Sequence, residues 1–325
     1  EVGPHYINSE SFSDCQLIMH DFGLQIKDHT PINVESIREN FQNLFHQVCE
    51  KNIDNDGFNA LVTKTNLGWR DITIIRAYSK YLRQVGITFS QVYMEDIIAK
   101  NPKIASAIVT LFLIRFDPSN LPAKKRKLQD LRKTLENSIG NIESADEDQI
   151  LRRFWNLVEA TLRTNYFQVT PLGEYKSYIS FKLDSTLIEE LPLPRPFREI
   201  FVYSQKVEGI HLRFGSIARG GLRWSDRRED FRTEILSLVK AQQVKNAVIV
   251  PVGSKGGFVI KNPPDKGGRD AMLKEGIDCY KIFISSYTDT LLHLYQIMHK
   301  ESYTVINDAY VDMNSIRKEV KRWVP

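Results

Sequence analysis

Cysteine is scarce in this chain, and the few cysteines it has are far apart. Cys15, Cys49 and Cys279 are odd in number, and no two of them have C-x-x-C spacing. The sequence therefore supports neither a disulfide framework nor a zinc site of paired cysteines. His46 lies three residues before Cys49, but two possible ligands without a second pair more often belong to an ordinary helix. We expect no metal and a cytoplasmic protein.

Long apolar runs are also missing. The longest apolar-rich stretch, residues 104–116, is shorter than the roughly 18 residues of a membrane-spanning helix. No apolar segment follows the polar residues 1–5, as a signal peptide would require. We therefore expect no membrane partner. The first residue is Glu rather than Met, which indicates a chain that begins inside a longer polypeptide.

Neither sign of charge dominates. The 44 Lys and Arg residues against 40 Asp and Glu residues give a net charge of +4 over 325 residues, which does not demand a nucleic-acid partner. The basic run at residues 124–127 has no interleaved aromatic residues on which bases could stack. An exposed helix face is therefore favoured over a nucleic-acid patch.

The first third of the chain has the helical period. Apolar residues recur every three or four positions over residues 37–116, as on the buried face of a helix. Pro102 predicts the first turn of a helix and Pro118 the end of one. We predict a mainly helical domain over residues 1–118, followed by a charged, solvated linker that carries a helix over residues 119–148.

The second half changes to the strand period. Residues 151–166 have the pattern of one more amphipathic helix. Strands are then predicted near residues 178–183, 200–203 and 210–214. The fold class is therefore α/β. We predict an α/β domain over residues 149–284 and a divergent tail of unknown role over residues 285–325.

The most informative segment begins with Arg219-Gly220-Gly221-Leu222-Arg223. Asp226 and Glu229 follow with capping-box spacing, so a helix is predicted from near Asp226 to near Lys245. The apolar residues 247–252 then predict a strand buried on both faces.

A glycine-rich segment follows that predicted strand. Gly253, Ser254, Lys255, Gly256 and Gly257 predict a loop at its carboxyl end, which is where open α/β sheets bind ligands. Glycines let the backbone approach a ligand closely while the lysine ammonium projects toward it.

Four cations would meet at this place, and together they predict an anion-binding pocket: Arg219, Arg223, Lys245 and Lys255. A phosphate-binding loop is the obvious alternative. It is disfavoured because the GxxxxGK[ST] spacing is missing and no Ser or Thr follows Lys255 to reach a magnesium ion. The dinucleotide fingerprint GxGxxG is absent from the whole sequence.

Residues 218–261 closely resemble the catalytic stretch of the large NAD-specific glutamate dehydrogenases. Weaker similarity to the same class extends the resemblance from about residue 15 to about residue 284. It rests on four shorter segments, residues 20–24, 56–59, 78–86 and 89–91. The resemblance implies a helical segment followed by the substrate-binding α/β domain of an amino-acid dehydrogenase.

The resemblance also implies roles for individual residues. In glutamate dehydrogenases generally, a lysine in a K-G-G-x-R motif binds a substrate carboxylate. Arg219 stands at that position, followed by Gly220, Gly221 and Arg223, and a guanidinium can bind a carboxylate through two parallel hydrogen bonds. A second lysine at the end of the following helix holds the other carboxylate, and Lys245 matches it.

The catalytic lysine of the G-x-K-G-G motif matches Lys255. By this resemblance, glutamate is oxidised to 2-oxoglutarate and ammonia by hydride transfer to NAD, and the lysine activates the attacking water. The cofactor would bind to a Rossmann domain that we expect to be absent from this chain. The resemblance further implies a homo-oligomeric intact enzyme, with glutamate or 2-oxoglutarate as its small-molecule partner.

Two interpretations remain open. The chain is either a fragment of such a dehydrogenase, inactive alone, or a non-catalytic remnant or regulatory subunit that binds dicarboxylates or partner subunits. A nucleic-acid-binding module is the third and least favoured interpretation.

Overall fold

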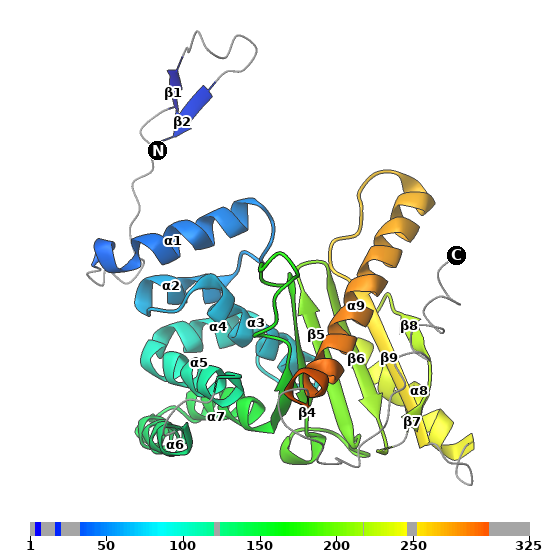
Figure 1. Cartoon of the computed structure of the whole chain (residues 1–325). Coiled ribbons are helices and arrows are strands. Elements are labelled where there is room, and N and C mark those ends of the chain that lie inside the picture. Colours follow the sequence, from blue (N-terminus) through cyan, green and yellow to red (C-terminus); the bar gives the residue numbers. More distant parts are fainter. Residues whose placement is uncertain are drawn as a thin grey trace.

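A group of helices packs against a mixed β-sheet in the computed structural model of the chain (Figure 1). The structure describes residues 4–7, 17–20, 33–119, 124–216, 218–245 and 252–298. The first described elements are two short antiparallel strands, β1 (Pro4–Ile7) and β2 (Leu17–His20). No single helix in the described ranges is long and apolar enough to cross a membrane. The helices Gln91–Lys100 and Pro102–Phe116 reach that length and apolarity only when they are counted together, and they meet at a bend of 97°.

The helical period of the first third is confirmed. Its helices are α1 (Val34–Cys49), the 3-10 turn η1 (Gly57–Ala60), α2 (Leu61–Lys64), α3 (Trp69–Gln84), α4 (Gln91–Lys100) and α5 (Pro102–Phe116). Pro102 is in the first turn of α5, as predicted, because proline has no N–H to contribute to the ladder there. α5 ends directly before Asp117.

Two further helices precede the sheet. α6 (Lys124–Gly140) lies in the segment predicted to be a solvated linker, and it buries Leu135 and Ile139. α7 (Ala145–Ala160) starts and ends earlier than the pattern of residues 151–166 predicts. That prediction is wrong at its end because Thr161–Thr164 form strand β3 and pair with the next strand.

The sheet of the second half has seven strands in the order β3-β4-β5-β6-β9-β7, with β8 also paired to β9. After β3 the strands are β4 (Tyr178–Leu183), β5 (Arg198–Ser204), β6 (Val207–Arg213), β7 (Ala218–Arg219), β8 (Leu222–Trp224) and β9 (Val252–Ile260). Neighbours from β3 to β9 are antiparallel, whereas β7 and β8 run parallel to β9. The three strands predicted around residues 178–214 are confirmed.

Helices cover both faces of this sheet. α9 (Gly268–Met298) crosses one face (Figure 1). Its Phe283 is buried with Ile200 and Val202 of β5. α8 (Phe231–Lys245) and the N-terminal helices cover the other face, which holds the larger part of the core. α9 continues without a break through residue 284, where the sequence predicts a domain boundary.

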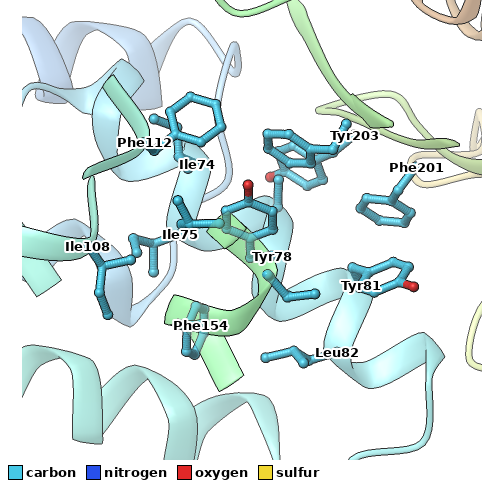
Figure 2. Packing of buried hydrophobic residues seen from close by; sticks show 14 of the residues in the cluster. Ile74, Ile75, Tyr78, Tyr81, Leu82, Ile108, Phe112, Phe154, Phe201 and Tyr203 are labelled. Atoms are coloured by element: carbon cyan, nitrogen blue, oxygen red, sulfur yellow. The ribbon is translucent and has the colours of Figure 1, made fainter. Parts of the chain in front are cut away.

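Aromatic rings join the helices to the sheet. Tyr78 of α3 stacks on Phe181 of β4 with 4.4 Å between ring centroids, and Phe112 of α5 meets the same two rings edge-on. Figure 2 shows Tyr78 and Phe112 within this cluster, with Tyr81 close to Phe201 of β5. The Tyr78 hydroxyl hydrogen-bonds Thr161, and burial raises its pKa. Such pairs add to the hydrophobic gain of burying large rings.

A buried ion pair lies within this apolar layer. Arg232 of α8 donates from Nε to Glu199 of β5 at 3.0 Å and from Nη2 at 2.5 Å, and both side chains are almost fully buried. The Tyr81 hydroxyl donates to the same carboxylate at 3.0 Å. Burial and the nearby carboxylate raise the pKa of Tyr81, which keeps it a neutral donor.

Breaking one half of this pair should be far costlier than neutralising both halves. Arg232→Met leaves a carboxylate buried without its counter-ion, so we expect urea unfolding to show a loss of about 3–5 kcal/mol. The double variant Arg232→Met with Glu199→Gln keeps an acceptor for Tyr81 and should recover most of that loss. Equal destabilisation of the single and double variants would contradict this assignment.

Candidate functional site around Lys255

The two glycine motifs of the sequence meet along strand β9. Arg219 of β7 is in register with Gly253, and Leu222 of β8 is in register with Gly256. The intervening Gly220 and Gly221 therefore lie beside Ser254 and Lys255. The Gly256 amide donates to the carbonyl of Gly221 at 3.2 Å. The structure thus joins segments that are more than thirty residues apart in sequence.

Close packing explains several of these glycines. A Cβ on Gly220 would overlap the backbone carbonyl of Ser254. A Cβ on Gly257 would overlap Ile235 of α8, and one on Gly256 would lie 2.9 Å from His211 Cδ2. Glycine is required at these positions because neighbouring elements occupy the space of a side chain.

The prediction that residues 253–257 form a loop is wrong. Gly253, Ser254, Gly256 and Gly257 all lie within β9. Gly253 pairs with β7, Ser254 with β6, and Gly256 and Gly257 with β6 on one side and β8 on the other. The glycine content predicted a loop, but here it lets α8 and the edge strands approach the sheet. The strand predicted at residues 247–252 lies outside the described residues, apart from Val252 of β9.

Lys255 lies on the α8 face of the sheet. Side chains alternate along a strand, and on either side of Lys255 the glycines at 253 and 257 face Gln242 and Ile235 of α8. Lys255 is half-buried. Its Nζ lies 3.9 Å from the position that a Cβ on Gly221 would occupy. The ammonium is therefore held against the Arg219-Gly220-Gly221 turn.

Helix α8 begins later than the sequence predicts. Residues 226–230 form a turn and the helix starts at Phe231, so the predicted start at Asp226 is wrong, although the end at Lys245 is confirmed. The capping box does not form. The Ser225 hydroxyl accepts from the Arg227 amide, and a side chain from α3 bonds the first turn of the helix.

Arg223 already has a carboxylate partner within the protein. Its Nε lies 2.5 Å from Oε1 of Glu234, and its side chain is half-exposed. Glu234 also accepts from the Ser225 hydroxyl. Of the four predicted cations, Arg223 thus has its charge balanced by an adjacent acid.

The other two predicted cations are placed by their backbone only. Arg219 is the last residue of β7, one position before the glycine pair that adjoins Lys255. Lys245 is the last residue of α8, the helix that packs over β9. Both side chains lie outside the described part of the structure.

Gln242 is a candidate site residue that sequence reasoning missed. Its Oε1 is buried and has no hydrogen-bond partner in the described structure. The same oxygen lies 3.0 Å from the position of a Cβ on Gly253. A buried polar atom without a hydrogen-bond partner costs folding free energy unless a bound molecule supplies the partner. The only signal in the sequence was its place one helical turn before Lys245.

His211 lies on the opposite face of the same strands. It is buried between Gly256 and the ring of Tyr287, whose centroid is 4.8 Å away, and its Nδ1 has no partner among the described residues. Burial lowers the pKa of His211 to about 3, and the nearby Arg213 charge adds to the shift. The imidazole is therefore neutral and packs between β9 and the ring of Tyr287.

The arrangement is suited to holding an anion beside a lysine. The described residues contain no group of three His, Cys, Asp or Glu side chains placed to bind a metal ion. Lys255 supplies a positive charge, and Gln242 an unpaired polar atom, on the α8 side of β9. Such a site can bind a carboxylate and offer an ammonium for proton transfer.

Comparison with known families matches most of the described chain. Residues 134–312 match the family described as bacterial NAD-glutamate dehydrogenase, catalytic domain. Residues 53–118 match the family described as glutamate dehydrogenase, helical motif 3. The first range contains every predicted site residue and extends beyond residue 284.

Individual relatives agree with these families. The chain is 47% identical over 277 residues to the NAD-specific glutamate dehydrogenase of Halomonas elongata, covering 85% of this chain and 17% of that protein. It is 47% identical to the enzyme of the same name from Pseudomonas aeruginosa over 83% of this chain and 17% of that protein. It is 52% identical to the enzyme of the same name from Mycobacterium tuberculosis over 73% of this chain and 15% of that protein. The chain thus spans about a sixth of these relatives.

The adjacent glycines should respond differently to alanine. Gly220→Ala puts a methyl group into the carbonyl of Ser254, so we expect thermal unfolding to show a loss of about 1–3 kcal/mol. Gly221→Ala meets nothing closer than Lys255 Nζ at 3.9 Å and should fold normally. If both variants melted like the wild type, the close approach of β9 to this turn would be refuted.

His211 should make stability fall with acid. The pKa is lower in the folded state, so protonation favours unfolding, and stability present above pH 6.5 is lost as the pH falls toward 3. At pH 5 this loss amounts to about 2 kcal/mol. Urea unfolding of wild type and His211→Leu at pH 7.5 and 5 should show a smaller loss for the variant. Parallel losses in both proteins would rule out this histidine as the cause.

Proposed function

This chain belongs to the bacterial NAD-glutamate dehydrogenase family, and from that premise we propose that it is the dicarboxylate-binding, lysine-bearing part of an enzyme that oxidatively deaminates L-glutamate. The observation that supports this most directly is the position of Lys255. Its ammonium lies against Gly221 of the Arg219-Gly220-Gly221 turn. The lysine and the motif that would bind a substrate carboxylate therefore share one place.

The roles divide among a few residues. Arg219 and Lys245 would each bind one carboxylate of glutamate or 2-oxoglutarate. Lys255 would stay beside the reacting carbon and assist the water that converts the imine to the ketone. Gln242 would accept from the amino group of glutamate through Oε1, its buried atom without a hydrogen-bond partner in the described structure. Arg223 would support the site through Glu234.

The described residues do not suit NAD. A dinucleotide fold uses parallel strands joined through helices and a GxGxxG turn. Here the strands from β3 to β9 are antiparallel neighbours, only the two short strands β7 and β8 run parallel to β9, and the sequence has no GxGxxG. NAD therefore enters the proposal only as the hydride acceptor of the longer enzyme, and no step on this chain depends on it.

Three finer proposals accompany the family assignment. We propose that the protein acts in the cytoplasm, that it works in glutamate breakdown, and that the intact enzyme is a homo-oligomer. The support is the family's chemistry together with cysteines that are unpaired in the described structure, Cys49 exposed and Cys279 buried.

Calorimetric titration of the 325-residue chain tests the proposal directly. We expect glutamate and 2-oxoglutarate to bind, Lys255→Ala to weaken binding at least about tenfold through loss of a charged contact, and Gln242→Leu to weaken it less. Lys240→Ala is the control, because Lys240 is an exposed lysine of α8, the helix of Gln242, and among the described residues its ammonium bonds only the carbonyl of Leu193.

Each result has a clear meaning. Dicarboxylate binding that depends on Lys255, with no response to NAD, supports a substrate-binding part of the dehydrogenase. Equal binding by wild type and Lys255→Ala, or no binding by a folded chain, would refute the proposed site.

A further inference from the structure

The first turn of α8 is bonded by a side chain from a distant helix. Backbone N–H groups at a helix start lack partners within the helix and usually bond a nearby Ser, Thr, Asp or Asn. Here the Arg232 amide donates to Oε1 of Gln84, which lies 148 positions earlier, at 3.2 Å. Gln84 is the last residue of α3.

The side-chain amide of Gln84 donates hydrogen bonds as well as accepting one. Its Nε2 donates to the carbonyls of Arg228 at 3.0 Å and Glu229 at 3.2 Å, in the turn that leads into α8. Its side chain is buried, so each bond forms away from competing water. One side chain thus fixes the entry to α8 through three hydrogen bonds.

A second contact from α3 reaches the same turn of α8. Tyr81, one helical turn before Gln84, donates to Glu199, and Glu199 holds Arg232. The two contacts flank Arg232 from its backbone and its side chain. Because this ion pair is buried, its members cannot separate without a large loss of free energy.

The far end of α8 lies at the candidate site. Gln242, in the last turn of α8, packs over Gly253 on one side of Lys255, and Lys245 ends the helix, whereas Ile235 near the start of α8 packs over Gly257 on the other side. Ten residues, about 15 Å of helix, separate Arg232 from Gln242, so a tilt of about 5° at the start moves Gln242 by about 1 Å. Displacements of about this size have large effects on catalysis.

We propose that α3 is a positioning element for the substrate site, in which Gln84 and Tyr81 set the direction of α8 and thereby the place of Gln242 over the strand that carries Lys255. The inference rests on the proposed function for its ligand, but its geometry stands independently. It gives the N-terminal helices a part in substrate affinity, although Gln84 and Tyr81 touch no substrate.

The test compares two glutamine substitutions of the same kind. Gln84→Met keeps the volume and removes all three bonds to the α8 entry. Gln91→Met is the control, because the Gln91 side chain bonds Lys80 and Glu95 of the N-terminal helices and, among the described residues, nothing in α8. Gln84→Glu keeps the acceptor for the Arg232 amide and should give an intermediate result.

Two readouts separate positioning from a merely structural role. Hydrogen exchange of the 325-residue chain should rise along the whole of α8 in Gln84→Met and stay unchanged there in Gln91→Met. Titration with 2-oxoglutarate should show about tenfold weaker binding for Gln84→Met, partly rescued in Gln84→Glu, at a temperature where wild type and all three variants are fully folded.

The outcomes also separate this inference from the proposed function. Faster exchange confined to the first turn of α8, or unchanged affinity for 2-oxoglutarate in Gln84→Met, would overturn the positioning role. If wild type binds no dicarboxylate, the proposed function fails, and the exchange pattern along α8 still decides whether α3 directs this helix.

Discussion

A buried charge needs a partner, and in this chain that need joins three elements. Glu199 of β5 accepts from Arg232 of α8 and from Tyr81 of α3 within an otherwise apolar layer. Hydrophobic packing alone would allow these elements to slide, because it has no preferred direction. The charge-assisted hydrogen bonds, in contrast, do have a preferred direction. These bonds tie the first turn of α8 to β5 and α3.

The sequence predicted the elements better than their contacts. The periods of residues 37–116 and 178–214 identified helices and strands correctly because burial repeats with the geometry of each element. The start of α8 was misplaced because the bonds to its first turn come from Gln84, far away in sequence. No local pattern contains that information. β3 was missed because its pairing with β4 overrides the helical pattern of residues 161–164.

At the candidate site, too, the sequence predicted the segments but not the contacts between them. Lys255 and Arg219-Gly220-Gly221 were recognisable from their motifs, and the structure brings these segments together along β9. The motifs did not show that the glycines of β9 accommodate neighbouring backbone and side chains, since that depends on what packs against them. Nor did they show that Arg223 is paired with Glu234 or that Gln242 lacks a partner. Both are properties of the folded surroundings.

The placement of Lys255 inside a strand limits how this segment can change length. Side chains alternate between the two faces of a sheet, so a shift by one position exchanges the faces. An insertion of one residue between Val252 and Lys255 would turn the ammonium away from α8 toward the face of His211 and Tyr287. Single-residue insertions and deletions in this segment are therefore incompatible with the site, whichever residue is added or removed.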